Sequence, residues 1–337
     1  MKNFKLRNEH LSPAKLTIVD GFPSGGKNLV SSLVSNLKNH DMWTSFYPLE
    51  TVSYCQSLGL IDSDAAKMIV LKELDCITRD QLFSRRVNLN LRDLSGLRNY
   101  RGWADSLRKL SRSSQDLKLH NLDEASYYSY GRDFAFYTHL NTQNLSFCFD
   151  AFGKKLNYIW VVPNFFVLNF YRQLSHWIQR WAKGDATVFF LEKRDSSNIE
   201  FPCILASKYV DDFIEASDIG KAVILTRSIL EETLSQIDSL FKRIKTPNFR
   251  VYKFENLVAD PHPYLSSIEN LTGSHFPKSI FHEMKKQNIP RARAFFEIEI
   301  KDYQRQLENS LVEMEGLYLK KHFEAICDSY SLLKERL

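Results

Sequence analysis

Cysteine is scarce in this chain and widely scattered. The 337 residues contain five cysteines, and no two of them lie close together in the sequence: Cys55, Cys76, Cys148, Cys203 and Cys327. Zinc knuckles and redox dithiols are built from closely spaced pairs. We therefore expect no metal site and interpret the cysteines as reduced packing residues.

Long apolar runs are also missing. The longest, residues 158–171, contains Pro163, Asn164 and Asn169 and is too short and too polar for a membrane span. The first 14 residues are polar and are broken by Pro13, so they lack the apolar core of a signal peptide. The sequence predicts a cytoplasmic protein without a membrane span.

Neither sign of charge is in strong excess. Lys and Arg number 45 against 40 Asp and Glu, which gives a formal net charge of +5. A balance this small argues against a dedicated nucleic-acid binder, and it is compatible with an anionic ligand. The apolar share of 44% and the charged share of 25% are those of a globular protein, and the length allows one main core.

A glycine-rich segment joins a short β-rich run to an amphipathic helix. Residues 15–20 are followed by the sequence GFPSGGKN at 21–28, and apolar residues then recur at helical spacing: Leu29, Val30, Leu33, Val34 and Leu37. A loop that wraps a phosphate needs inward-pointing backbone N–H groups, little hindrance from Cβ atoms and a helix N-terminus. The segment fits the G-x-x-x-x-G-K-[ST] pattern except at Asn28, where a hydroxyl residue would hold magnesium. It predicts a nucleotide phosphate site, formed by Pro23, Ser24, Gly25, Gly26, Lys27 and Asn28.

The rest of the chain alternates between strand-like and helical patterns. Apolar segments suited to buried parallel strands lie at 158–162, 187–191, 222–226 and 249–254. Helical patterns lie between them at 167–181 and 229–244. The alternation predicts an α/β fold, a three-layer parallel sheet of P-loop type, in a single domain over 1–337. We expect residues 41–135, which show helical patches and no confident strand, to be a mainly helical insertion, and the C-terminus to be helical.

From Phe22 onward the loop resembles, without a gap, the Tyr-Pro-Lys-Ser-Gly-Thr-Thr-Trp loop of the sulfotransferases. That family shares the P-loop fold and uses the loop to hold the 5′-phosphosulfate of 3′-phosphoadenosine 5′-phosphosulfate (PAPS), without a metal. The resemblance implies a transferase that passes a sulfonate from PAPS to a hydroxyl of a carbohydrate or small-molecule acceptor. The oligomeric state stays open.

Two further segments resemble this family. Residues 254–261, FENLVADP, are similar to a Tyr-Glu-Asp-Leu-Val-x-Asp-Pro segment, which places Phe254 at the cofactor. The family binds the 3′-phosphate of PAPS with an arginine at a strand end and a serine eight residues later, and Arg227 and Ser235 have that spacing. In a competing register, residues 137–140 and 158–171 match the same region, and the arginine and serine become Val161 and Asn169.

The resemblance assigns catalysis with one departure. The family's loop lysine falls on Ser24 here, and we expect Lys27 to neutralise the charge of the leaving group in its place. The resemblance places a Thr-His pair at Thr138 and His139, and a histidine titrates near neutral pH. His139 is therefore the candidate general base for the acceptor hydroxyl.

Two other functions remain open. Lys27, together with an apolar strand that ends at Glu192 and could hold magnesium, is compatible with an ATP-dependent kinase. Asn28 counts against this function. The substitutions at Ser24 and Asn28 would also fit a non-catalytic nucleotide-binding relative.

Overall fold

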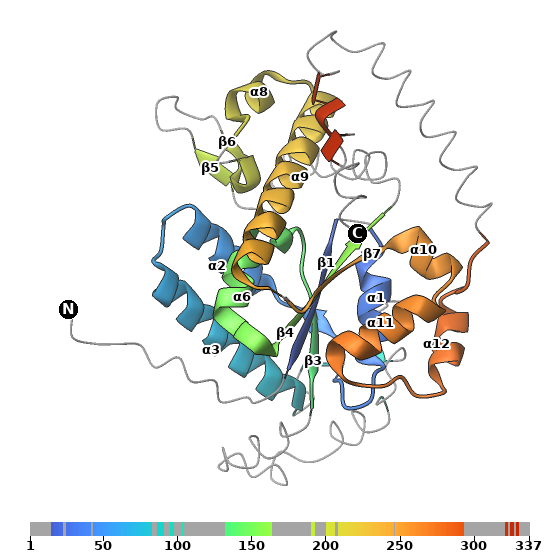
Figure 1. The fold of residues 1–337 in the computed structure, drawn as a ribbon. Helices are drawn as coiled ribbons and strands as arrows, with labels where there is room; N and C mark the ends of the chain where they lie inside the picture. Colours follow the sequence, from blue (N-terminus) through green and yellow to red (C-terminus); the bar gives the residue numbers. More distant parts are fainter. Residues whose placement is uncertain are drawn as a thin grey trace, which may run out of the picture.

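The computed structural model describes most of the chain, with gaps (Figure 1). The described residues are 15–22, 25–41, 43–82, 86–90, 95–97, 103, 132–163, 190–192, 200–205, 208–245, 247–292, 321–322, 324–326 and 328–329. The helix expected at 167–181 lies outside these residues, as does most of the C-terminus that was expected to be helical.

A parallel sheet forms the centre of the molecule. Its strand order is β2-β3-β1-β4-β7, and all four neighbouring pairs are parallel. The strands are β1 (Leu16–Gly21), β2 (Thr44–Ser45), β3 (Phe134–Tyr137), β4 (Leu156–Val162) and β7 (Phe249–Lys253). Every residue of β1 and β4 is buried, as expected for the middle of a sheet covered on both faces. The strands predicted at 15–20, 158–162 and 249–254 are confirmed.

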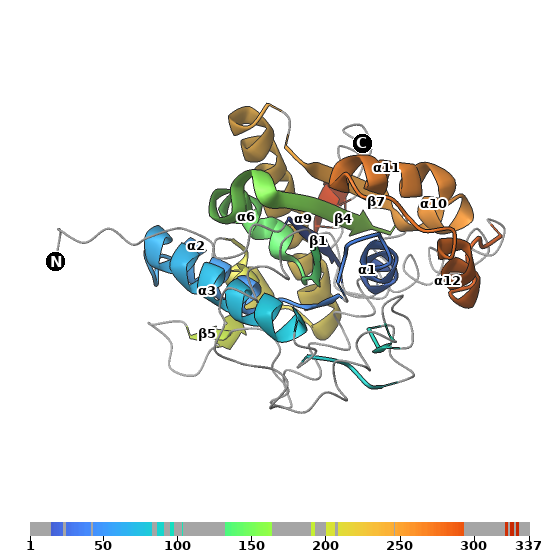
Figure 2. The same ribbon diagram turned by 90° about the horizontal axis from the view of Figure 1, so that it is seen from below.

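Helices cover both faces of this sheet, which confirms the three-layer α/β prediction (Figure 2). One face carries α1 (Lys27–Ser35), α10 (Phe254–Ala259), α11 (His262–Thr272) and α12 (Ile280–Lys286). The other carries α2 (Tyr47–Ser57), α3 (Ser63–Leu82), α6 (Leu145–Phe152) and α9 (Asp218–Arg243). Alternate strand residues enter the two cores: Ile18 and Trp160 pack on the α9 side, Val19 and Ile159 on the α1 side.

Two of the predicted strands of the main sheet are wrong. Residues 222–226 lie within the 26-residue helix α9, whose N-cap Ser217 accepts a hydrogen bond from the Gly220 N–H. Because all five of these residues are buried, their apolar run has no exposed face to show the helical period. The second, at 187–191, is described only from Phe190 onward, where β5 (Phe190–Glu192) lies. This strand pairs antiparallel with β6 (Glu200–Pro202) in a separate two-stranded sheet.

The described part of the region 41–135 contains helices but also part of the sheet. Helices α2 and α3 occupy its first half. The expectation of no strand is wrong at both ends, because β2 pairs with β3, which begins at Phe134. With two residues, β2 is too short to produce a pattern of its own.

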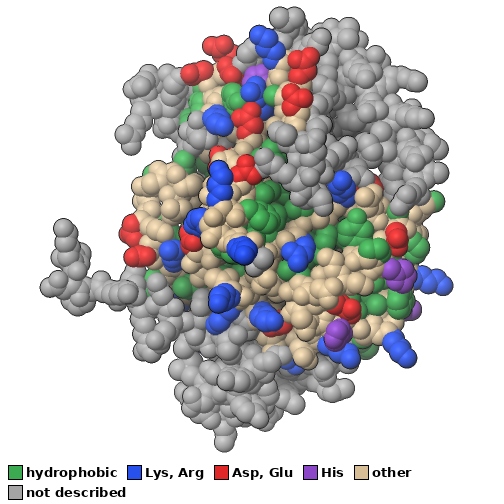
Figure 3. Space-filling view, in the orientation of Figure 1, with side chains coloured by type: hydrophobic (Ala, Val, Ile, Leu, Met, Phe, Trp, Pro, Cys, Tyr) green, Lys and Arg blue, Asp and Glu red, His purple; other side chains and the backbone are tan. Residues whose placement is uncertain are grey.

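Shorter elements connect these layers. They are the 3-10 helices η2 (Asn141–Asn144), η3 (Gly153–Lys155) and η4 (Cys203–Leu205), and the helix α8 (Val210–Glu215). Lys and Arg side chains gather near the middle of the face shown in Figure 3. The end of α9 and the turn that leads to β7 carry three exposed basic residues: Lys242, Arg243 and Lys245. This turn precedes the first residue of β7, so it lies at the amino edge of the sheet, opposite the glycine-rich loop.

Candidate functional site

The glycine-rich loop leaves the carboxyl end of the central strand. The chain runs from β1 through α1 to the edge strand β2, whereas the chain after β4 continues toward β7 on the other side. In parallel α/β sheets, ligands bind where neighbouring connections diverge in this way. Close packing explains two glycines: a Cβ at Gly21 would lie 2.6 Å from the Val161 carbonyl oxygen, and one at Gly25 would lie 3.0 Å from the Phe22 oxygen. Pro23 and Ser24 lie outside the described residues.

Gly26 turns the loop into helix α1. It is the N-cap residue, in the left-handed conformation with φ 87°, which a residue with a side chain adopts at a cost. A Cβ there would lie 2.0 Å from the ring of Phe254, the first residue of α10. The guanidinium of Arg291 lies 5.9 Å from the same ring centroid. The structure thus places Phe254 beside the loop.

Lys27 lies in the first turn of α1 and points inward. Its side chain is 4% exposed, and its Nζ donates a hydrogen bond to the Phe22 carbonyl oxygen at 3.2 Å. Burial lowers the pKa of Lys27 to about 8, although the carboxylates of Asp20 and Glu50 raise it. The next residue, Asn28, is exposed. The loop therefore holds a buried ammonium group beside the N-terminus of a helix, a combination that attracts an anion.

His139 follows β3 and forms a pair with Glu50 of α2. The Glu50 Oε1 accepts a hydrogen bond from the His139 backbone N–H at 2.8 Å and lies 3.2 Å from its Nδ1. The two side chains keep part of their surface exposed, 25% for His139 and 17% for Glu50. The His139 ring is also stacked parallel to the Tyr47 ring at 6.1 Å. These contacts fix the orientation of the imidazole. Glu50 contacts Nδ1 and not the other ring nitrogen, Nε2.

Burial shifts both pKa values of this pair toward the neutral forms. It raises the pKa of Glu50 to about 8, helped by the charge of Asp20 and opposed by the His139 N–H and Lys27. It lowers the pKa of His139 to about 3, and Lys27 acts in the same direction. Shifted groups of this kind are common where proton transfer takes place. The sequence did not indicate Glu50, because 89 residues separate it from His139.

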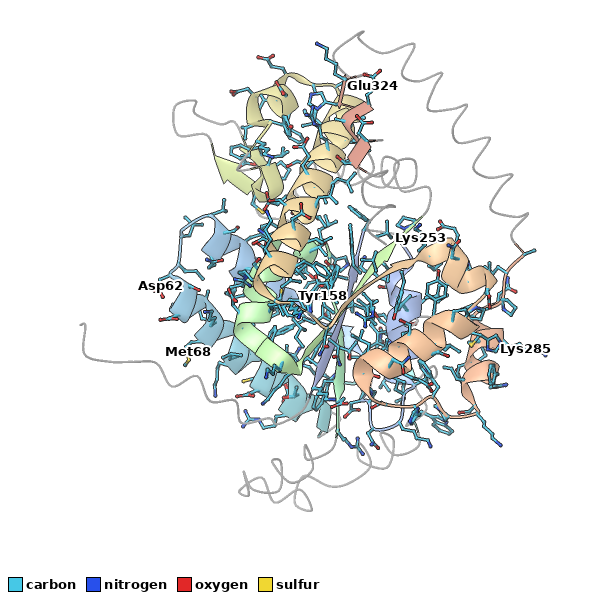
Figure 4. The ribbon with its side chains drawn as sticks, viewed as in Figure 1. Asp62, Met68, Tyr158, Lys253, Lys285 and Glu324 are labelled. Carbon is cyan, nitrogen blue, oxygen red and sulfur yellow. The ribbon has the colours of Figure 1, made fainter. Side chains whose placement is uncertain are left out.

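Asp20, the last residue before Gly21, is a buried carboxylate that reasoning from the sequence also missed. It is 0% exposed, and its Oδ2 accepts hydrogen bonds from the Thr142 N–H at 2.7 Å and the Tyr158 hydroxyl at 2.8 Å. Figure 4 shows Tyr158 in the middle of the molecule. An acid at the end of an otherwise apolar strand, directly before the loop, was the available signal.

The predicted pair Arg227 and Ser235 lies on helix α9 rather than after a strand. The Arg227 Nε donates to Glu231 at 2.8 Å, its guanidinium lies 4.6 Å from the Tyr209 ring centroid, and its Nη1 is 3.2 Å from His322 Nδ1. Ser235 is exposed. None of these partners of Arg227 belongs to the loop. In the competing register, Val161 is indeed at a strand end, but it is fully buried in the core, and Asn169 lies outside the described residues.

The described residues lack two features that would have pointed to other functions. They contain no helix that is both long and apolar enough to cross a membrane. Nor do they bring together three His, Cys, Asp or Glu side chains that could share a metal ion. Glu192, the carboxylate considered for magnesium, lies on β5 in the separate small sheet.

No family model matches the chain, and no curated protein matches it. Among solved structures it is similar to the sulfotransferase domain from the curacin biosynthetic pathway, at 11% identity over 80% of this chain and 77% of that one, with a TM-score of 0.42. It is also similar to the sulfotransferase domain of the Synechococcus PCC 7002 olefin synthase, at 11% identity over 84% of this chain and 81% of that one, with a TM-score of 0.43. A sulfotransferase from Mycobacterium tuberculosis is similar at 11% identity over 87% of this chain and 75% of that one, with a TM-score of 0.40. Likenesses this distant leave the function to be argued from the site itself.

Proposed function

We propose that this chain is a transferase that binds PAPS at the loop of residues 21–28 and passes its sulfonate to a hydroxyl of a carbohydrate or small molecule. The observation that carries the proposal is the placement of two groups at one edge of the sheet. A buried lysine and a histidine–carboxylate pair follow the carboxyl ends of the neighbouring parallel strands β1 and β3, and the charge of the lysine lowers the pKa of the histidine. The lysine can bind an anion, and the histidine–carboxylate pair can take up the proton of an acceptor hydroxyl.

The loop supports the binding half of the proposal. Gly25 and Gly26 pack so closely that a Cβ would fill the space, and the N-terminus of α1 starts at Lys27. Backbone N–H groups at such a turn hold phosphate oxygens without a metal. PAPS would supply a sulfonate activated by its 5′-phosphate. Lys27 would stabilise the negative charge left on that phosphate when the bond to sulfur breaks.

The pair of Glu50 and His139 supports the transfer half. When Glu50 is ionised, which is its minor form at pH 7, it accepts a hydrogen bond from the His139 Nδ1–H and leaves the Nε2 lone pair available to an acceptor hydroxyl. As the oxygen forms its bond to sulfur, its proton passes to Nε2, and the Nδ1 proton can move to Glu50. The pKa of Glu50, raised to about 8, lets the pair hold this proton near neutral pH. His139 is then the general base, and Glu50 orients it.

A titration with two ligands tests the binding half. We expect 3′,5′-adenosine bisphosphate (PAP) to bind the purified chain in isothermal titration calorimetry. The substitution Lys27→Met keeps the apolar stem and removes the charge, so it should weaken PAP binding by roughly 10- to 100-fold. The exposed Lys242, at the opposite edge of the sheet, provides the control Lys242→Met, which should bind like the parent.

The remaining outcomes decide between functions. Transfer of radiolabelled sulfonate from PAPS to a panel of sugars and phenols would establish the activity. Binding of ATP with magnesium in place of PAP would replace the proposal with the kinase function. Binding of neither ligand would contradict phosphate binding at the loop.

A further inference from the structure

Asp20 is an unusual neighbour for a phosphate site, because it brings a buried carboxyl group to the start of the loop. Its Oδ2 is held by Thr142 and Tyr158, but its Oδ1 is buried with no hydrogen-bond partner within the part of the chain that the structure describes. Burial of an ionised carboxylate is costly unless its charge is compensated. The nearby compensating charge is that of Lys27, for which Asp20 is the stronger of the two acidic influences.

The charges of the buried site balance close to zero. Asp20 acts on Lys27 of α1, on Glu50 of α2 and on His139 after β3. At pH 7 Lys27 carries a positive charge, while Glu50 is mostly protonated and His139 is neutral, as their pKa values of about 8, 8 and 3 require. Among these described groups, the positive charge of Lys27 is therefore offset by Asp20.

We propose that Asp20 is a specificity-determining residue that makes the loop prefer a terminal group with one negative charge, such as a sulfonate, over a terminal phosphate with two. The inference rests on the proposed function, since it requires an anion at the loop. A first negative charge on the ligand gains from Lys27 and from the helix N-terminus. Because Asp20 offsets much of the attraction of Lys27, a second negative charge gains little in the site, while it loses more hydration on entering.

A matched pair of ligands isolates this effect. PAPS and adenosine 3′-phosphate 5′-diphosphate differ only in the terminal group, which is a sulfonate with one charge or a phosphate with about two at pH 7.5. We expect the parent chain to bind PAPS more tightly. Asp20→Asn keeps the acceptor oxygen for Thr142 and Tyr158 and removes the charge. It should reduce the ratio of the two dissociation constants on the order of tenfold.

Tyr158→Phe is the control for a purely structural role. It removes one hydrogen bond to Asp20 and leaves the charge in place, so the ratio should stay at the parent value even if both affinities fall. An unchanged ratio in Asp20→Asn would overturn the inference while the proposed function stands. If the parent chain bound neither ligand, the proposed function would fail, and this inference with it.

A pH series on the parent chain tests the same idea without a variant. Between pH 7.5 and 5.5 the terminal phosphate takes up a proton, with a pKa of about 6, whereas the sulfonate does not. Lys27 and Glu50 are mostly protonated at pH 7.5 and almost fully protonated at pH 5.5, and His139 stays neutral, given their pKa values of about 8, 8 and 3. This change in the protein is the same for both ligands. The diphosphate should therefore approach PAPS in affinity as the pH falls. A ratio that stays constant across the series would overturn the inference.

Discussion

Lys27 and Arg227 were expected to meet one cofactor, and the structure gives them different environments. At the loop, Lys27 has a single hydrogen bond, to a carbonyl oxygen, and Asp20 keeps an unpaired Oδ1, counting the described residues. On α9, Arg227 is bonded to Glu231, which also accepts the Tyr209 hydroxyl at 2.9 and 3.1 Å. The first group has bonding capacity left for a ligand, and the second has used much of its own.

The pKa values follow the same division. At the loop, burial dominates and moves the pKa of Lys27, Glu50 and His139 toward the neutral forms. On α9, burial also acts to raise the pKa of Glu231, but hydrogen bonds from Arg227 and Tyr209 hold it below its ordinary value. A charge that its neighbours satisfy is typical of a structural contact, whereas charges that are buried without full satisfaction mark functional sites.

The largest expected effect is on transfer by the histidine–carboxylate pair. His139→Gln removes the proposed base, and the rate of sulfonate transfer should fall about 10²- to 10⁴-fold because general base catalysis is worth that much. PAP affinity should change less than threefold, since neither group is proposed to hold the cofactor. The rate is measured with radiolabelled PAPS and the affinity by calorimetry.

Glu231→Gln on α9 is the matched control for this pair, because it removes a hydrogen-bonded carboxylate away from the loop. Its transfer rate should match that of the parent chain. Equal losses in His139→Gln and Glu231→Gln would remove the distinction between the two regions.

The contact between Gly26 and Phe254 should give the largest effect on stability. Gly26→Ala places a Cβ against the Phe254 ring in a left-handed residue, and we expect a loss of about 3 kcal/mol in the free energy of unfolding. Gly273, with φ 73°, is less crowded, because among the described residues a Cβ added there would have only the flexible Lys15 Nζ within 4 Å, at 3.6 Å. Gly273→Ala should therefore cost only about 1 kcal/mol. Urea unfolding gives both values, and equal losses would show that Phe254 does not press on the loop.

The pH dependence of stability sharpens the description of the loop. Because the pKa of Glu50 is raised, the folded state keeps the Glu50 proton between about pH 4.5 and pH 8, whereas the unfolded state loses it. The free energy of unfolding therefore falls as the pH rises through that window. The lowered pKa of His139 has the opposite effect, so the free energy of unfolding rises with pH between about pH 3 and pH 6.5. The two effects oppose each other up to about pH 6.5. Between pH 6.5 and 8 the loss from Glu50 exceeds the small gains from His139 and from Lys27, whose pKa is lowered to about 8, and a net loss of about 1 kcal/mol should follow.

Glu50→Gln tests this assignment. The variant has no proton to lose, so urea unfolding at pH 6.5 and pH 8 should give nearly equal free energies of unfolding. Glu283, a carboxylate of α12 paired with Lys286, provides the control Glu283→Gln, which should retain the decline of the parent chain. A decline that persists in Glu50→Gln would assign it to another group.

The sequence was informative where local pattern and tertiary role agree. The central strand, the loop and α1 form one continuous segment, so the spacing of glycines and apolar residues was enough to predict them. The helix around Arg227 was missed because buried strands and buried helices both present apolar runs. Glu50 could not be assigned to the site, because only the pairing of β2 with β3 brings the start of α2 beside His139.

Arg227→Met should have the smallest effect, and it tests the other half of the comparison. The substitution removes an ion pair with Glu231 and a cation–π contact with Tyr209, which together stabilise the fold by about 1 kcal/mol. Urea unfolding should show that loss, and PAP affinity should stay within threefold of the parent value because the partners of Arg227 lie on α9, beside α8 and in the helical segment around His322. A tenfold or greater loss of PAP binding at unchanged stability would instead return Arg227 to the cofactor site that its spacing from Ser235 first suggested.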